Sequence, residues 1–109
     1  MKKIEALITP FKVDEVKAAL AKAGVTGITF SEVKDYGHQP SHVGHYRGSE
    51  YVVDLLPEIK VEVIADDEDV RAVTETIIGA LRTGHLGDGE ISILPMETVL
   101  RVRAGVRGA

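Results

Sequence analysis

The order of apolar patterns along the chain is its most constraining feature, because the succession strand, helix, strand occurs twice. In each half, a short apolar run is followed by apolar side chains at helical spacing and then by a second short run. The six segments are residues 4–8, about 12–23, 27–36, 59–63, 70–81 and 90–94. Two βαβ halves of similar length predict an α+β fold, the ferredoxin-like βαββαβ sandwich, with both helices on one face of a small antiparallel sheet.

Local signals indicate where these elements begin and end. Gly24 and Gly84 stand where each helix should stop, as glycine does at helix C-termini. The acidic run Asp66–Asp69 offers an N-cap and first-turn acids to the second helix, and we favour that interpretation over a metal site. A last short strand is expected over Val99–Arg103, after the second βαβ half.

Between the two halves lies a segment of different composition. From Gly37 to Ser49 the chain has three Gly, one Pro, two Ser and three His, with few apolar residues. This composition predicts a long protruding loop over about residues 37–54, and loops of that length are usually functional or disordered. Tyr51 has little reason to be buried there, so it invites contact with a partner or covalent modification.

The three histidines of this segment have a spacing that could suit a transition metal, since imidazole binds zinc and copper. His38 and His42 are separated by three residues, and His42 and His45 by two. Neither a cysteine nor a helical register supports such a site. We therefore interpret these side chains as solvated and predict no metal site.

Length and composition exclude several classes of function. With 109 residues, 44% of them hydrophobic, residues 1–109 are expected to form one domain around one core. A net charge of −4, three Tyr, two Phe and no Trp argue against nucleic-acid binding. No apolar run is long enough for direct membrane insertion, and the absence of cysteine excludes disulfides and thiolate chemistry. The N-terminus lacks a signal-peptide pattern, so the expected location is the cytoplasm.

Two segments near the C-terminus are candidates for binding an anion. Thr83–Gly89 holds three glycines, which let backbone N–H groups approach a phosphate closely, although a helix end with a tight turn would need the same residues. Arg101 and Arg103 alternate along the expected strand, so both guanidiniums leave one face and suit a phosphate. We find no pattern of nucleophile and base, so the chain is interpreted as a binding protein and not as an enzyme.

Seven segments of the chain together match a known family pattern. They are Met1–Ile4, Pro10–Lys12, Gly24–Gly27, Tyr46–Tyr51, Val53–Pro57, Thr83–Gly89 and Arg101–Arg103. On these segments the chain resembles the PII signal-transduction proteins (nitrogen regulatory protein P-II), without a gap from Met1 to about Gly105. The most specific of them are the Tyr-Arg-Gly-x-Glu-Tyr segment at 46–51 and the Thr-Gly-x-x-Gly-Asp-Gly segment at 83–89.

The resemblance implies a homotrimer of ferredoxin-like subunits that binds an adenine nucleotide in each cleft between subunits. In such proteins the long loop docks on a target transporter or enzyme, typically in nitrogen regulation. Tyr51 matches a tyrosine that some members have nucleotidylylated, and Gln39 matches a loop glutamine that helps to hold Mg-ATP and 2-oxoglutarate. The nucleotide-binding residues that the resemblance implies are Gly27, Ile28, Thr29, Gln39, Glu62, Val63, Ile64, Gly87, Asp88, Gly89, Arg101 and Arg103.

Two acidic residues depart from the family pattern. Glu58 and Glu90 stand where PII proteins usually have lysines, one pairing with 2-oxoglutarate and the other touching the nucleotide phosphates. A pair of unit charges roughly 6 Å apart interacts by about 3 kcal/mol at an effective dielectric of about 20, so these changes disfavour a triphosphate. The alternative is therefore a PII variant that prefers AMP or ADP (adenine nucleotides of lower charge), responds little to 2-oxoglutarate and regulates inorganic carbon or metal transport. A second possibility is that either acid pairs with a nearby Lys or Arg and never faces the ligand.

Two interpretations from other classes stay open at this point. The arginines and the glycine segment would also suit a small phosphatase or nucleotide hydrolase, which nucleotide turnover would reveal. His38, His42 and His45 would suit a trimeric metal-binding protein, which equilibrium dialysis of the His42→Ala variant would test.

Overall fold

The computed structural model describes residues 1–36, 42–46, 49–53, 55–82 and 89–102, the second and third of these ranges by their backbone. A short 3-10 turn precedes each helix, at Pro10–Lys12 and at Asp67–Asp69. The helices and strands follow the predicted order, with one additional pair of strands between the halves. In chain order they are β1 (Lys2–Ile8), α1 (Val13–Lys22), β2 (Ile28–Tyr36), β3 (His42–Tyr46), β4 (Ser49–Val53), β5 (Leu55–Ala65), α2 (Val70–Leu81) and β6 (Gly89–Pro95).

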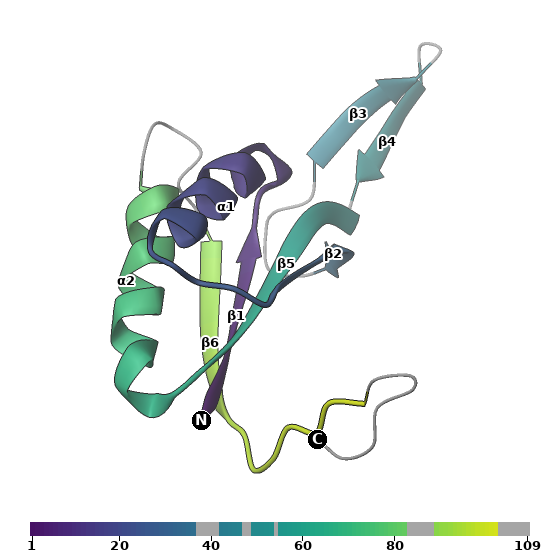
Figure 1. The fold of residues 1–109 in the computed structure, drawn as a ribbon. Coiled ribbons are helices and arrows are strands. Elements are labelled where there is room, and N and C mark those ends of the chain that lie inside the picture. The colour runs from purple at the N-terminus through teal and green to yellow at the C-terminus, as the bar shows by residue number, and fades with distance from the viewer. Residues whose placement is uncertain (37–41, 47–48, 54, 83–88, 103–109) are drawn as a thin grey trace.

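Four of the strands form one antiparallel sheet in the order β2-β5-β1-β6. Strand β1 lies inside the sheet, where Ile4 is opposite Val63 of β5 and Ile93 of β6. Both helices lie on the same face of this sheet (Figure 1). This topology is the ferredoxin-like α+β sandwich, so the predicted fold class is confirmed.

The core lies between the helices and the sheet. Inward positions alternate along the strands and recur every three to four residues along the helices, as the sequence pattern predicts. Burial of one large aliphatic side chain stabilises the fold by about 1.5–3 kcal/mol, so this pattern fixes which sheet face the helices cover. The buried apolar residues are Ile4, Ala6, Ile8, Val16, Leu20, Val61, Val63, Val73, Ile77 and Leu81.

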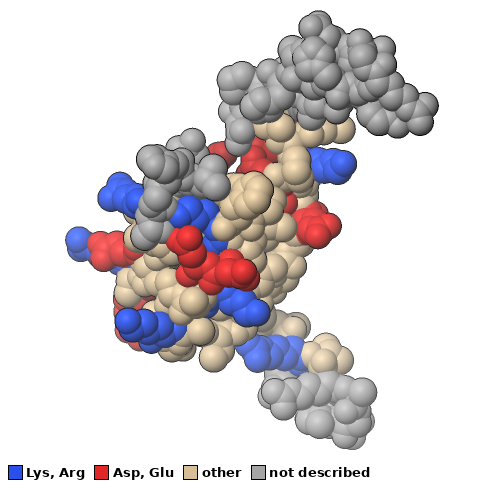
Figure 2. Space-filling view, turned by 90° about the horizontal axis from the view of Figure 1, so that it is seen from above, with Lys and Arg blue, Asp and Glu red and all other residues tan. Residues whose placement is uncertain are grey.

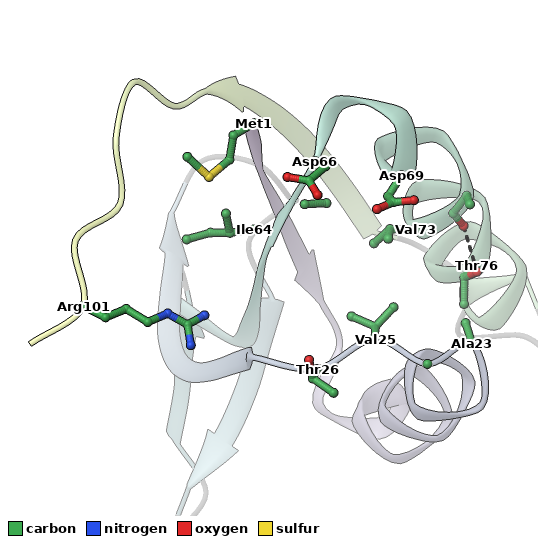
Figure 3. A pocket seen from close by; sticks show the side chains of 13 residues that line it. Met1, Ala23, Val25, Thr26, Ile64, Asp66, Asp69, Val73, Thr76 and Arg101 are labelled. Atoms are coloured by element: carbon green, nitrogen blue, oxygen red, sulfur yellow. Dashed lines mark hydrogen bonds between the residues drawn. The ribbon is translucent and has the colours of Figure 1, made fainter. Parts of the chain in front are cut away.

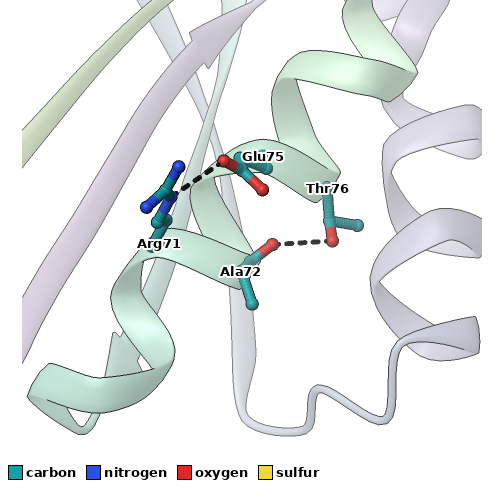
Figure 4. Close-up of polar contacts among 4 residues, drawn as sticks. All are labelled: Arg71, Ala72, Glu75 and Thr76. Atoms are coloured by element: carbon teal, nitrogen blue, oxygen red, sulfur yellow. Dashed lines mark hydrogen bonds and ion pairs between the residues drawn. The ribbon is translucent and has the colours of Figure 1, made fainter.

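The outward face of α2 is held by local contacts. Arg71 Nε lies 3.1 Å from Glu75 Oε1 one turn later, and both side chains are exposed (Figure 4). The hydroxyl of Thr76 donates a hydrogen bond to the carbonyl of Ala72 at 2.8 Å. The Arg71–Glu75 pair stabilises the helix by only a few tenths of a kcal/mol, and a threonine hydroxyl bonded to the carbonyl four residues earlier is slightly unfavourable for a helix. Packing of the inward face therefore decides the position of α2.

The predicted loop over residues 37–54 contains a β-hairpin. Strands β3 and β4 pair antiparallel, with Gly44 opposite Tyr51, and they extend beyond the four-stranded sheet (Figure 1). The expectation of a segment without strands was therefore wrong for 42–46 and 49–53. Backbone pairing between neighbouring strands needs no apolar face, so a Gly- and His-rich composition does not exclude it.

Two local expectations are also corrected. Val99–Val102 form no strand, because no neighbouring strand of the described chain pairs with them, and Val102 is 93% exposed. Asp66 makes no side-chain capping bond, because the chain enters α2 through a 3-10 turn in which the Asp69 N–H donates to the Asp66 carbonyl at 2.9 Å. The stop at Gly24 is confirmed, since this residue has φ +80° and its N–H donates to the Ala21 carbonyl.

The surface of the described residues carries charges of both signs. In the view from above, blue and red side chains alternate over the described part of that face and form no extended basic field (Figure 2). Neither α1 nor α2 is long and apolar enough to cross a membrane, and they are the helices that the described residues contain.

Candidate functional site

The structure places the two predicted base-binding segments side by side, at the start of β2 and near the end of β5. Ile28 pairs with Val63 and Thr29 pairs with Glu62 across the two strands. Gly27 precedes β2 with φ +70°, a backbone conformation that side chains with a Cβ rarely adopt. The sequence thus brings these residues together through strand register, although they are more than thirty positions apart.

The six residues of these segments do not present the same groups. The side chains of Ile28 and Val63 pack on the helix side, and Val63 is only 2% exposed, so Val63 can offer a ligand only its backbone. Thr29, Glu62 and Ile64 lie on the opposite face of the sheet, because successive strand residues alternate. Ile64 is 43% exposed and supplies an apolar contact there.

On that same face, one lysine connects two carboxylates. Lys3 Nζ lies 3.0 Å from Glu5 Oε1 and 3.2 Å from Glu62 Oε2. Glu5 and Glu62 are directly opposite each other in the register of β1 and β5, an arrangement that two negative charges disfavour unless a cation lies between them. The hydrogen bonds to Glu5 and then to Glu62 raise the pKa of Lys3 above its ordinary value of 10.5.

A cavity of about 520 Å³ opens beside the base-binding segments. Arg101 and Ile64 lie on one side of it, and Asp66 and Val73 lie on the helix side (Figure 3). Thr26, directly before Gly27, also lines it. The cavity therefore combines apolar walls with a guanidinium at one side and carboxylates at the other.

Gly89, the described end of the predicted phosphate-binding segment, begins β6 and has a packing role of its own. A Cβ added at Gly89 would lie 2.9 Å from Leu81 Cδ1 and 3.1 Å from the carbonyl oxygen of Leu7. The sequence offered two reasons for the glycines of this segment, an approaching phosphate or a helix end with a tight turn. The close approach of Leu81 of α2 and of the β1 backbone to this residue is a packing reason for glycine at the start of β6.

The two ends of the predicted site lie far apart within one chain. Gly89 pairs with Ile8, whereas Ile28 pairs with Val63, which in turn pairs with Ile4. At about 3.4 Å per residue and about 4.8 Å per strand, four residues along the strands and three strand spacings across them give a separation of roughly 20 Å. By the same measure Glu62, which pairs with Glu5 and lies two strands from β6, is roughly 14 Å from Gly89.

Arg101 lies with the base-binding segments and not with Gly89, because it lines the cavity beside Ile64. Within one chain, Arg101 and Gly89 therefore do not lie together at one phosphate site. Glu90 follows Gly89 and is exposed, while Glu58 is 8% exposed.

The remaining predicted positions are described in part or not at all. Gln39, Gly87, Asp88 and Arg103 lie outside the described residues, as does His38. Tyr51 is described by its backbone in β4, and His42 and His45 by their backbone in β3. Their predicted roles stay predictions.

Lys3 and the cavity-lining residues Thr26 and Asp66 were not among the predicted site residues. Lys3 had a usable signal, since residues 3 and 5 share one face of the first strand and carry opposite charges. Among the described residues, Asp66, Glu68 and Asp69 bring their carboxylates within 4.8 Å of one another, but all three are exposed, as such clusters commonly are without a metal.

Comparison with known proteins identifies the family of this chain. The family model described as nitrogen regulatory protein P-II matches residues 1–106. The chain belongs to the P-II family. A nitrogen regulatory protein P-II of Nostoc punctiforme is 53% identical over 105 residues, which cover 96% of this chain and 94% of that protein. Those of Rhizobium meliloti and Azospirillum brasilense are 54% and 52% identical over 108 residues, 99% of this chain and 96% of each relative. The resemblance on seven segments is therefore confirmed over nearly the whole P-II chain.

Proposed function

We propose that this P-II family chain is a non-catalytic regulator in nitrogen regulation. It assembles as a homotrimer, binds an adenine nucleotide in each cleft between two copies, and controls a target transporter or enzyme through residues 37–54. The β3–β4 hairpin in that segment extends beyond the sheet, where a target protein can reach it (Figure 1).

The observation that carries this proposal is the separation of roughly 20 Å between the base-binding segments and Gly89 along and across one sheet. We infer from this separation that the two ends of the site are brought together between two copies and not within one chain. This requires that the Ile28–Thr29 edge of one copy faces the Gly89 end of the next. The proposal thus explains why residues at opposite ends of one sheet serve the same ligand.

The described residues supply suitable groups for the base end. Thr29 and Glu62 lie opposite each other in register and offer a hydroxyl and a carboxylate, and Ile64 offers an apolar surface for a flat ring. Arg101 extends into the adjacent cavity and provides a guanidinium for a phosphate.

A second candidate function is favoured by the exposed Glu90, which follows directly after Gly89. Glutamate at this position supplies no positive charge to the phosphate end, so a ligand of lower negative charge loses less there. The protein would then prefer AMP or ADP, respond little to 2-oxoglutarate, and regulate inorganic carbon or metal transport.

Calorimetric titration with Mg-ATP, ADP and AMP, each with and without 2-oxoglutarate, tests both proposals. We expect binding of at least one adenine nucleotide, and its loss by about tenfold or more in Arg101→Ala. Tight Mg-ATP binding that 2-oxoglutarate strengthens would exclude the second candidate. Sedimentation of the chain as a monomer, or no binding of any adenine nucleotide, would refute the shared site. Nucleotide turnover by the purified protein would contradict a non-catalytic role.

A further inference from the structure

We propose that Lys3 is a positioning residue of the nucleotide site, which holds the Glu62 carboxylate as the acceptor for a hydrogen-bond donor of the bound nucleoside. The inference rests on the proposed function and assigns a role to a residue outside the predicted site. The donor is either the exocyclic amine of adenine or a ribose hydroxyl, since both present an N–H or O–H to a carboxylate.

Lys3 holds one oxygen of the Glu62 carboxylate through an ion pair. Lys3 Nζ contacts Glu62 Oε2 at 3.2 Å, and the two side chains are 28% and 27% exposed. Within the described residues Glu62 makes this one polar side-chain contact, so its Oε1 is available to a ligand. A carboxylate tied at one oxygen and available at the other is a preorganised acceptor.

The neighbouring strand shows where that acceptor lies. Glu62 sits on β5 between Lys3 of β1 and Thr29 of β2, and Thr29 is its direct cross-strand partner. The ion pair therefore lies on the side of Glu62 away from the predicted base position. Lys3 itself does not contact the ligand in this arrangement.

Glu5 explains why the lysine is needed for position and not only for charge balance. Glu5 Oε1 lies 3.0 Å from the same Nζ, and Glu5 is directly opposite Glu62. Without Lys3 the two carboxylates would repel each other across the strands, and Glu62 would turn away from the position that the ion pair fixes. Loss of Lys3 should therefore alter ligand selectivity as well as affinity.

The test compares ADP with two analogues that each lack one donor. Purine riboside 5′-diphosphate carries a hydrogen in place of the exocyclic amine, and 2′-deoxy-ADP lacks the 2′-hydroxyl of the ribose. Calorimetric affinities are measured for the full chain and for Lys3→Met, with Lys60→Met as the matched control. Lys60 is on the same sheet face, and within the described residues no ion pair is found for it. Thermal unfolding of each variant without nucleotide checks that it folds.

We expect wild-type selectivity for ADP over one of the two analogues, and a loss of roughly tenfold in that ratio in Lys3→Met, as for a hydrogen bond to a charged group. Lys3→Arg should restore the ratio, and Lys60→Met should leave it unchanged. In a Glu62→Gln background, Lys3→Met should add no further loss.

Unchanged selectivity of Lys3→Met against both analogues would overturn the inference while leaving the proposed function intact. An additive loss in the Glu62→Gln background would also overturn it, because Lys3 would then act independently of Glu62. Failure of the wild-type protein to bind any adenine nucleotide would instead refute the proposed function, and this inference with it.

Discussion

Replacing Gly89 by alanine should destabilise the protein, whereas the same replacement at Gly79 should stabilise it. At Gly89 the new Cβ meets Leu81 Cδ1 at 2.9 Å and the Leu7 carbonyl oxygen at 3.1 Å. Leu81 is 4% exposed and the carbonyl belongs to a paired strand, so neither can move freely. Overpacking of this kind costs about 1–3 kcal/mol.

At Gly79 the same replacement is expected to increase the stability of the folded protein. Gly79 lies inside α2, and no atom lies within 4 Å of an added Cβ. Alanine is favoured over glycine in a helix interior by about 0.5–1 kcal/mol, chiefly because the unfolded chain then loses less conformational freedom. The two variants therefore contain the same chemical change and differ only in surroundings.

Thermal unfolding in nucleotide-free buffer, at one fixed protein concentration, measures the difference. Each kcal/mol corresponds to roughly 4–8 °C in Tm for a domain of about 100 residues. We expect a lower Tm for Gly89→Ala and a higher one for Gly79→Ala. A Tm of Gly89→Ala equal to that of the wild type would show that the approach of Leu81 and Leu7 to residue 89 does not require glycine. Glycine at that position would then have to be explained by the ligand alone.

Three further measurements test other parts of the structure. Ile77→Ala should reduce the free energy of unfolding by about 2–5 kcal/mol in urea denaturation, because Ile77 is fully buried between the helices and the sheet; a loss below about 1 kcal/mol would contradict its place in the core. Arg71→Ala should change that free energy by no more than about 0.5 kcal/mol, since its ion pair with Glu75 is exposed. Because the pKa of Lys3 is raised in the folded state, its charged ammonium group stabilises that state fully below about pH 10.5. This stabilisation is lost as the pH rises above that value. Stability measured from pH 9 to pH 12 should fall less in Lys3→Met than in the wild type, and parallel curves would contradict the contacts of its ammonium group.

The fold was predictable because it depends on the spacing of apolar residues within each helix and strand, which can be seen in the sequence. The apolar spacing of Val73, Ile77 and Leu81 has the helical period, and Val61 and Val63 alternate as strand residues do. These residues form the core that the structure shows. The strand expected at Val99–Arg103 was wrong, because alternation alone does not make a strand without a neighbour and 99–102 pair with no strand of the described chain.

The candidate site was predictable in part only. The sequence indicated Thr29 and Glu62, but it could not show that they are cross-strand partners or that Val63 points into the core. Such facts depend on register, which is set by the pairing of distant segments. The packing role of Gly89 likewise depends on how closely Leu81 and the carbonyl of Leu7 approach it, and a single sequence does not give these distances.

The positions of the two site halves have a genetic consequence. Since each proposed cleft combines Thr29, Glu62 and Arg101 of one subunit with Gly89 of another, no single polypeptide contains a complete site. Two alleles, one damaged at Thr29 and one damaged at Gly89, should thus complement each other when expressed together, because mixed rings contain some clefts built from two undamaged edges. Either allele expressed alone would form only clefts with one damaged edge.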